Sequence, residues 1–231
     1  MEQAGNKCDC DQCQLKTLFF SHIGSEELSD ICEIKREENF TAGERIIKEG
    51  EVISEFIYMK EGLVKLSKIT GNSKEQILSF SEPFDFVSLL SVFSSDSYKY
   101  SVTALKNTTV CIIDLQVVKN FAKTNAMFAM DLMSKISETT DKIILDNLEI
   151  KRKNLKGRVA HLLLYFANSV FSSMEFELPV SRREIADYIG MTTENVIRTL
   201  SEFRKDKIIK IYGKDIQFVD MKRLETISEL G

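Results

Sequence analysis

Two residues spaced four apart, Glu194 and Arg198, carry the side chains best suited to recognising nucleic-acid bases. An arginine can donate two hydrogen bonds to guanine, and a glutamate can accept one from the amino group of cytosine. In a helix both would lie on one face with Thr193 and Ile197, so this helix is predicted to present four side chains to a DNA groove. The alternative is an exposed ion pair between Glu194 and Arg198, worth a few tenths of a kcal/mol, and both can hold together.

The residues before this helix predict how it is positioned. Ser181 followed three residues later by Glu184 is typical of a capping box that starts a helix at about Arg182. Gly190 suits the left-handed residue that ends such a helix before a sharp turn. Thr192 or Thr193 would then cap the second helix, which we expect to reach about residue 205. This is a helix-turn-helix.

Residues 208–218 predict a wing behind it. The runs 208–212 and 216–218 read as two strands, and Gly213-Lys214-Asp215 reads as a tight turn between them. Lys210 and Lys214 in such a wing would contact DNA phosphates without reading sequence. The segment therefore predicts a winged helix-turn-helix.

The net charge of −4 hides an asymmetry along the chain. Residues 151–231 hold 15 Lys and Arg against 11 Asp and Glu, a net of +4, so residues 1–150 carry −8. The C-terminal third is therefore the part suited to a polyanion. There is no run of 18 apolar residues, and residues 1–16 lack the apolar stretch of a signal peptide, so we expect a cytoplasmic protein with no membrane contact.

Residues 37–115 predict an antiparallel β-rich domain. Glycines at positions 43, 50, 62 and 71 separate short apolar runs at about ten-residue spacing. After Leu115, residues 116–151 hold no Gly or Pro and have helical periodicity, with a break expected near Asn125. In that helix one stripe steps by three and four: Met133, Ile136, Thr140, Ile143, Asn147 and Ile150.

This stripe predicts a two-stranded coiled coil that holds a homodimer, with Thr140 and Asn147 fixing its register. The alternative is that it packs on the chain's own β-domain. A second apolar face, Leu132, Ile144, Leu145 and Leu148, allows both, because a two-faced apolar helix needs two partners.

The helix-turn-helix, the wing and the order of β-roll, long helix and winged helix resemble the Crp/Fnr family of transcription regulators over nearly the whole chain. The resemblance implies an α+β fold with an N-terminal antiparallel β-roll of the cyclic-nucleotide-binding kind, a long dimerisation helix and a C-terminal winged helix-turn-helix. It implies a homodimer on a two-fold symmetric DNA operator, with RNA polymerase as a further partner.

The resemblance also implies roles for single residues. Glu194 and Arg198 lie at the positions where family members read a TGA-type half-site, and Thr193 and Ile197 lie at positions that adjust specificity. Ser181 and Arg182 are expected near phosphates, which gives a DNA-binding set of Ser181, Arg182, Thr192, Thr193, Glu194, Ile197, Arg198, Lys210 and Lys214.

Cyclic AMP is not the expected ligand. Family members that bind it carry a Gly-Glu pair for the ribose and an Arg-Ser pair for the phosphate. Ser88-Leu89 and Tyr98-Lys99 stand at those places. Leucine cannot form a hydrogen bond to a hydroxyl, and tyrosine cannot neutralise a phosphate. Lys99 would then be the only residue of the four that could neutralise the phosphate.

The cysteines leave several interpretations open. In the oxygen-sensing Fnr branch, three N-terminal cysteines and one later cysteine hold a 4Fe–4S cluster. Cys10 and Cys13 match the first two and Cys111 matches the last, whereas Phe19 stands at the third and Cys8 would have to replace it. The set Cys8, Cys10, Cys13 and Cys111 is thus the candidate for iron. Zinc, a reversible disulfide, or buried thiols with no metal and an unknown small-molecule effector are the alternatives.

Four segments follow from these patterns: a cysteine-bearing segment 1–18, a β-roll sensor 19–120, a dimerisation helix 121–152 and a winged helix-turn-helix 153–231. An enzyme is disfavoured, because no nucleophile triad, Gly-rich nucleotide loop or zinc-spaced His pair occurs and two histidines offer little acid–base capacity. A cyclic-nucleotide-binding module without DNA contacts is disfavoured by the complete wing. The sequence therefore predicts a DNA-binding transcription regulator whose β-roll senses a signal such as oxygen or redox state.

Overall fold

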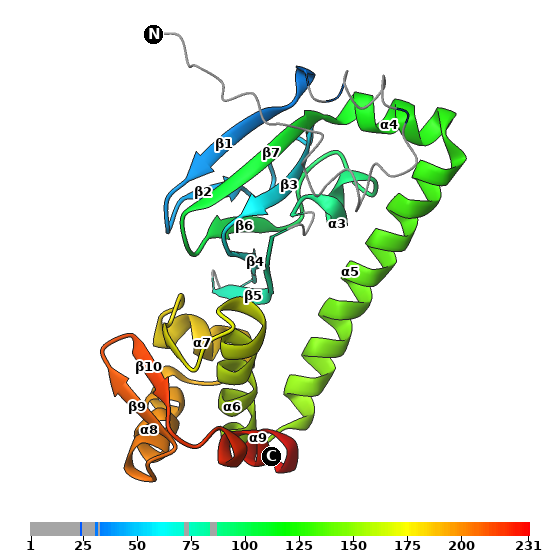
Figure 1. Ribbon diagram of the computed structural model, residues 1–231. Helices are drawn as coiled ribbons and strands as arrows, with labels where there is room; N and C mark the ends of the chain where they lie inside the picture. Colours follow the sequence, from blue (N-terminus) through cyan, green and yellow to red (C-terminus); the bar gives the residue numbers. More distant parts are fainter. Residues whose placement is uncertain (1–23, 25–30, 32, 72–73, 84–86) are drawn as a thin grey trace, which may run out of the picture. The chain divides into compact units, whose positions relative to one another are not determined.

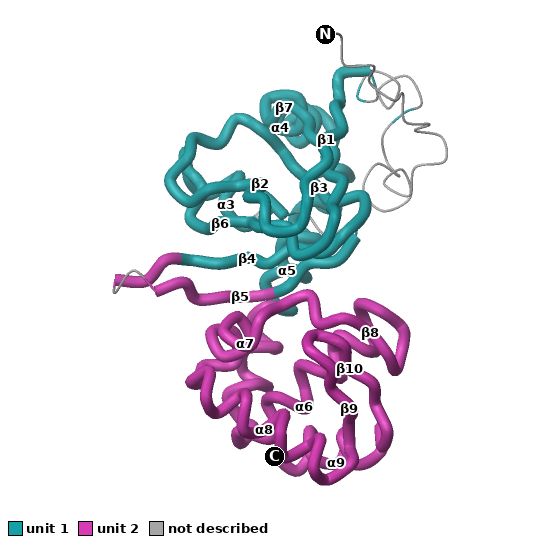
Figure 2. The backbone as a smooth tube through the Cα atoms, turned by 90° about the vertical axis from the view of Figure 1, so that its left-hand side faces the viewer, with its two compact units in different colours: residues 1–68, 80–142 teal, residues 69–79, 143–231 magenta. Residues whose placement is uncertain are grey.

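The computed structural model describes residues 24, 31, 33–71, 74–83 and 87–231. The chain divides into two compact units, which Figure 2 colours separately. Unit 1 comprises residues 1–68 and 80–142, and unit 2 comprises residues 69–79 and 143–231. No helix in the described part of the chain is long and apolar enough to cross a membrane.

The β-roll is built on two antiparallel sheets (Figure 1), whose strands lie in unit 1 except for the end of the fourth strand and most of the fifth, which belong to unit 2. One sheet has the order β1-β7-β3, and the other has the order β2-β6-β4-β5. A one-turn helix, α3 (Leu89–Val92), precedes β6. The strands are β1 (Arg36–Phe40), β2 (Arg45–Ile47), β3 (Glu55–Glu61), β4 (Val64–Ile69), β5 (Glu75–Ser81), β6 (Ser101–Ala104) and β7 (Thr108–Asp114). The predicted β-domain is confirmed.

Side chains along β7 point alternately to the two faces of its sheet, and the core of unit 1 is divided between these faces. Cys111 and Ile113 lie in one buried cluster with residues of α4 (Leu115–Thr124) and of the first turns of α5 (Ala126–Arg152). Phe128, at 0% exposed, joins that cluster from α5. Successive strand side chains point to opposite faces, so helices cover one face of this sheet and the roll encloses the other. The predicted break near Asn125 is confirmed, since the Asn125 amide closes α4 by donating to Phe121 O.

One face of α5 stays exposed, and of the predicted seam it includes only Met133. Ile136 packs on the unit 1 cluster, Ile150 is buried, and Asn147 Nδ2 donates to Leu78 O at 3.2 Å. The seam therefore belongs largely to the chain's own packing, which is the alternative that the sequence left open. The exposed apolar residues of α5 are Met127, Met130, Met133, Ile144, Leu145 and Leu148, each 51–62% exposed. We call these six residues the open face of α5.

Unit 2 holds the helix-turn-helix and its wing (Figure 1). Its helices after α5 are α6 (Leu155–Tyr165), a π-helical turn η1 (Phe166–Val170), α7 (Arg182–Ile189), α8 (Thr193–Lys205) and α9 (Met221–Leu230). Its sheet has the order β8-β10-β9, with strands β8 (Glu175–Glu177), β9 (Ile209–Tyr212) and β10 (Asp215–Phe218). The helix and strand bounds agree with the predicted winged helix-turn-helix.

Candidate nucleic-acid interface

Helix α7 starts and ends as its sequence predicts. Ser181 Oγ accepts from the Glu184 amide at 3.2 Å, and Glu184 Oε2 accepts from the Ser181 amide at 2.8 Å, which completes a capping box. Gly190 ends the helix at φ +70°, a left-handed conformation that favours glycine. The turn that follows places α8 directly against α7, with Ile185, Ala186, Ile189, Val196 and Leu200 all buried.

Helix α8 has one buried face and one exposed face. Thr192 caps it, because its hydroxyl accepts from the Asn195 amide at 3.3 Å. Val196, Leu200 and Phe203 are at most 3% exposed. Glu194, Ile197 and Arg198 are exposed on the other side, and Thr193 is half-buried at the first turn. We call Thr193, Glu194, Ile197 and Arg198 the reading face.

The ion pair between Glu194 and Arg198, which the sequence offered as an alternative, is not formed in the described structure. Arg198 Nη2 instead donates to Asn195 Oδ1 at 3.0 Å, a contact that the sequence analysis missed. The backbone amide at the helix N-terminus and the Thr192 hydroxyl lower the pKa of Glu194. Glu194 therefore stays an anionic acceptor at neutral pH, and Arg198, with five N–H donors, keeps donors free for a base.

A cleft of about 450 Å³ adjoins Arg198 between α8 and the start of α6. Lys156 and Glu202 line it and form an ion pair of 2.8 Å, and this pair lowers the pKa of Glu202. Lys156 is not among the residues predicted from the sequence to contact DNA. The structure brings it beside the reading face.

The wing is a two-residue hairpin. Tyr212 pairs with Asp215, so Gly213 and Lys214 form the turn. Lys214 is exposed, whereas Lys210 Nζ donates across the hairpin to Gln217 Oε1 at 3.1 Å. Arg182 was expected near a phosphate, but its Nη2 donates to the carbonyl of Gly213 at 2.7 Å.

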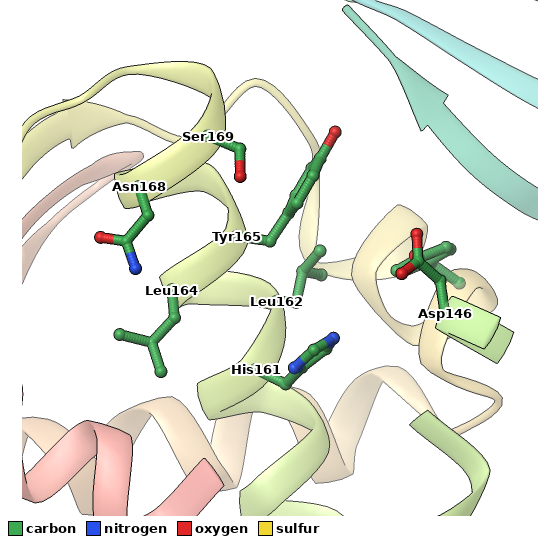
Figure 3. A pocket seen from close by; sticks show the side chains of 8 residues that line it. Asp146, His161, Leu162, Leu164, Tyr165, Asn168 and Ser169 are labelled. Atoms are coloured by element: carbon green, nitrogen blue, oxygen red, sulfur yellow. The ribbon is translucent and has the colours of Figure 1, made fainter. Parts of the chain in front are cut away.

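A second cleft in unit 2, about 290 Å³, lies between α5, α6, η1 and α7 (Figure 3). His161 and Asp146 face it together with Tyr165, and Tyr188 lines it from α7. Burial, reinforced by the charge of Lys153, lowers the pKa of His161. His161 is thus a half-buried, neutral residue at neutral pH on the wall of a cleft, and is less enclosed than its apolar sequence neighbours suggest.

In the β-roll, two residues that replace the cyclic-nucleotide ligands have structural partners. Ser88 Oγ accepts from the Ile57 amide at 2.9 Å. The Tyr98 hydroxyl donates to Glu55 O at 3.2 Å, and burial, with the charges of Glu55 and Glu51, raises the pKa of Tyr98 to about 12. Both side chains are engaged in packing the roll and offer no cation for a phosphate.

Cys111 is the one member of the candidate iron set within the described residues, because Cys8, Cys10 and Cys13 lie outside them. Its side chain is 0% exposed in β7, and its Sγ donates to Glu37 Oε1 at 3.7 Å. A 4Fe–4S cluster needs four ligands, so this part of the structure alone does not supply a cluster site. Ile31 is 3% exposed in the same buried cluster.

Comparison with known proteins agrees with both domains. Residues 157–227 match the Crp-like helix-turn-helix domain, and residues 37–125 match the cyclic nucleotide-binding domain. Electron transport regulator A of Shewanella oneidensis is 26% identical, over 97% of this chain and 92% of that protein. The transcriptional activator protein Anr of Pseudomonas protegens is 27% identical, over 94% of this chain and 91% of that protein.

Solved structures agree as well. FixK2 from Bradyrhizobium japonicum superposes with a TM-score of 0.73 at 26% identity, covering 84% of this chain and 97% of that chain. A CRP-family regulator from Thermus thermophilus gives a TM-score of 0.72 at 18% identity over 83% and 96% of the two chains, which bears on the fold alone. Fold and site define a winged helix-turn-helix protein with a β-roll of the cyclic-nucleotide-binding kind. The chain carries a Crp-like helix-turn-helix domain and a cyclic nucleotide-binding domain, and it is similar over nearly its whole length to Crp/Fnr-type transcription regulators.

Proposed function

We propose that the protein is a dimeric, sequence-specific DNA-binding transcription regulator whose β-roll senses a signal and whose α8 reads the operator. The observation that carries the proposal is the reading face: a helix capped by Thr192 exposes Glu194, Ile197 and Arg198 opposite a buried apolar face. A helix N-terminus in the major groove presents such side chains to base edges. The proposal assigns the chain a binding function and no catalytic step.

Within this proposal Arg198 donates to a guanine in each half-site and Glu194 accepts from the cytosine of a neighbouring pair. Thr193 and Ile197 contact adjacent bases and adjust the preference. Ser181, Thr192, Lys210 and Lys214 lie at the rim of the helix-turn-helix and wing, and they contact backbone phosphates, which sets register and salt dependence without reading sequence.

The open face of α5 is the proposed dimer interface. Six large apolar side chains on one helix face exceed what an isolated surface helix normally exposes, so a second copy of the helix is the expected cover. A dimer would place two reading helices on a two-fold symmetric operator, with half-site centres about 34 Å apart. RNA polymerase is the proposed further partner of the bound dimer.

The relatives support a signal linked to electron transport or oxygen. Their names include Electron transport regulator A and the Fumarate and nitrate reduction regulatory protein of Vibrio cholerae. We propose by similarity that this chain responds to redox state or oxygen, within the cytoplasm.

A cluster held by Cys8, Cys10, Cys13 and Cys111 is one candidate sensor, favoured by the match of Cys10, Cys13 and Cys111 to cysteine positions of the Fnr branch. Anaerobic reconstitution should then load about four irons per chain and give absorption near 400 nm, with Cys32→Ser as a matched control that retains the iron. A colourless protein that binds its operator equally in air and under nitrogen would contradict the cluster and favour an effector without metal.

The test of the DNA-binding proposal is fluorescence anisotropy on an operator selected from random duplexes, at fixed salt. Arg198→Ala should weaken binding by about 1–3 kcal/mol per half-site and relax the preference at one base pair. Lys222→Ala removes the same charge from an exposed site on α9 and should leave that preference unchanged. Equal loss on every duplex for Arg198→Ala would mean that Arg198 contacts a phosphate.

A further inference from the structure

Both carbonyl groups of the wing turn accept hydrogen bonds, one from the first residue of α7 and one from the residue that follows β8. The Gly213 carbonyl accepts from Arg182 Nη2 at 2.7 Å, and the Lys214 carbonyl accepts from the Leu178 amide at 2.9 Å. Gly213 has φ +64°, so the turn uses a left-handed residue at the point that Arg182 holds. Two separate donors therefore fix the orientation of a two-residue turn.

This attachment determines which groups of the turn face outward. A trans peptide holds its C=O and N–H on opposite sides. Because the Gly213 carbonyl points to Arg182, the amide of Lys214 points away from Arg182. The Lys214 side chain is exposed, so this residue offers both an N–H directed away from Arg182 and an exposed ammonium group. This pair of donors suits one DNA phosphate.

Arg182 is placed to hold the turn. It is the first residue of α7, directly after the Ser181 cap, so its backbone is fixed by the capping box. Its side chain is half-buried, and that burial lowers the pKa of the guanidinium, which nevertheless remains charged at any physiological pH. Its neighbour Arg183 has a side chain 77% exposed and a long ion pair of 3.9 Å to Asp187. Two adjacent arginines thus have different surroundings.

We infer that Arg182 is a positioning residue that holds the wing turn so that Lys214 meets the DNA backbone, and that it is not itself a phosphate contact. This replaces the expectation from the sequence, and it rests on the proposed DNA-binding function.

A double-mutant cycle tests the inference on DNA. Arg182→Gln, Lys214→Gln and the double variant are compared on one duplex between 50 and 200 mM salt. Each phosphate contact contributes about 0.9 to the slope of log K against log salt. If Arg182 acts through Lys214, each single variant flattens the slope by the contribution of about one phosphate contact per half-site. The double variant then flattens the slope no further. If the double variant loses twice as much as either single variant, Arg182 contacts its own phosphate and the inference is wrong.

Arg183→Gln is the matched control, since it removes the same charge one residue away. Its effect on the slope, whatever its size, should add to that of Lys214→Gln, because Arg183 does not hold the wing. Arg182→Lys retains one donor and should recover part of the loss of Arg182→Gln.

A second readout needs no DNA. The Leu178 amide is protected from hydrogen exchange by the Lys214 carbonyl, so a loosened turn exposes it. Its exchange should be faster in Arg182→Gln and unchanged in Arg183→Gln and Lys214→Gln, with the Val196 amide of α8 as a measure of intact folding. Unchanged exchange in Arg182→Gln overturns the inference. If the unaltered protein binds no duplex, the proposed function fails, whereas the exchange measurement still decides whether Arg182 holds the wing.

Discussion

Charging the open face of α5 should abolish the dimer. Leu145 and Leu148 are 62% and 55% exposed in the single chain, and their replacement by Glu places two carboxylates per chain in the proposed interface. Both side chains are more than half exposed in the described part of the structure, so the folded single chain should persist.

The magnitude follows from the exposed fractions. Full burial of a leucine side chain stabilises by about 1.5–3 kcal/mol. Somewhat more than half of each side chain remains available, so each contributes about 1–1.5 kcal/mol when a second copy covers it. Two residues on two chains give about 4–6 kcal/mol, which corresponds to a dissociation constant raised by about 10³–10⁴-fold. Desolvation of the carboxylates adds to the loss.

Sedimentation equilibrium across micromolar concentrations measures this directly. Leu145→Glu with Leu148→Glu should sediment as a monomer, and circular dichroism should report an unchanged helix content. The matched control is Asn120→Glu with Lys123→Glu, two exposed positions on α4 outside the open face. A Leu145 and Leu148 variant that remains as dimeric as this control would refute the assignment of the interface.

Three further predictions concern single residues. The pKa of His161 is lowered in the folded chain, so the unfolded chain binds the proton first as the pH falls below 6.5, and stability should decrease on acidification through that region. His161→Gln should flatten the dependence of Tm on pH there. An unchanged slope of Tm against pH would contradict this role of His161. Gly190→Ala should cost about 1–2 kcal/mol of stability in urea unfolding, because alanine is strained at φ +70°, and a neutral result would argue against the left-handed turn. Tyr98→Phe should cost about 0.5–1.5 kcal/mol through loss of its bond to Glu55 O, whereas a variant of unchanged stability would show that the bond contributes nothing.

Local signals in the sequence were sufficient for the helix-turn-helix. The capping box, Gly190 and the Thr192 cap act within a few residues, so spacing alone located α7, α8 and the wing hairpin. The strand runs around Phe56 and Val110 were recognisable for the same reason, since each is a short apolar run between turn residues.

Contacts between distant segments were not predictable in this way. The pairings of Glu37 with Cys111 and of Thr103 with Lys65 join residues 74 and 38 positions apart, so no local pattern locates β1 and β6 in the sheets. The bond from Arg182 to Gly213 spans 31 residues and depends on how the wing folds back. Helix α5 has two apolar faces, and their periodicity is the same whether a face packs on the chain's own domains or on a second copy.

Selection of bound sequences from random duplexes tests the central claim most directly, performed with the unaltered protein and with Arg198→Ala. We predict that the unaltered protein enriches a two-fold symmetric sequence with a guanine in each half, and that the variant loses the preference at that position alone. Failure of the unaltered protein to enrich any symmetric sequence would contradict the assignment of α8 as a reading helix.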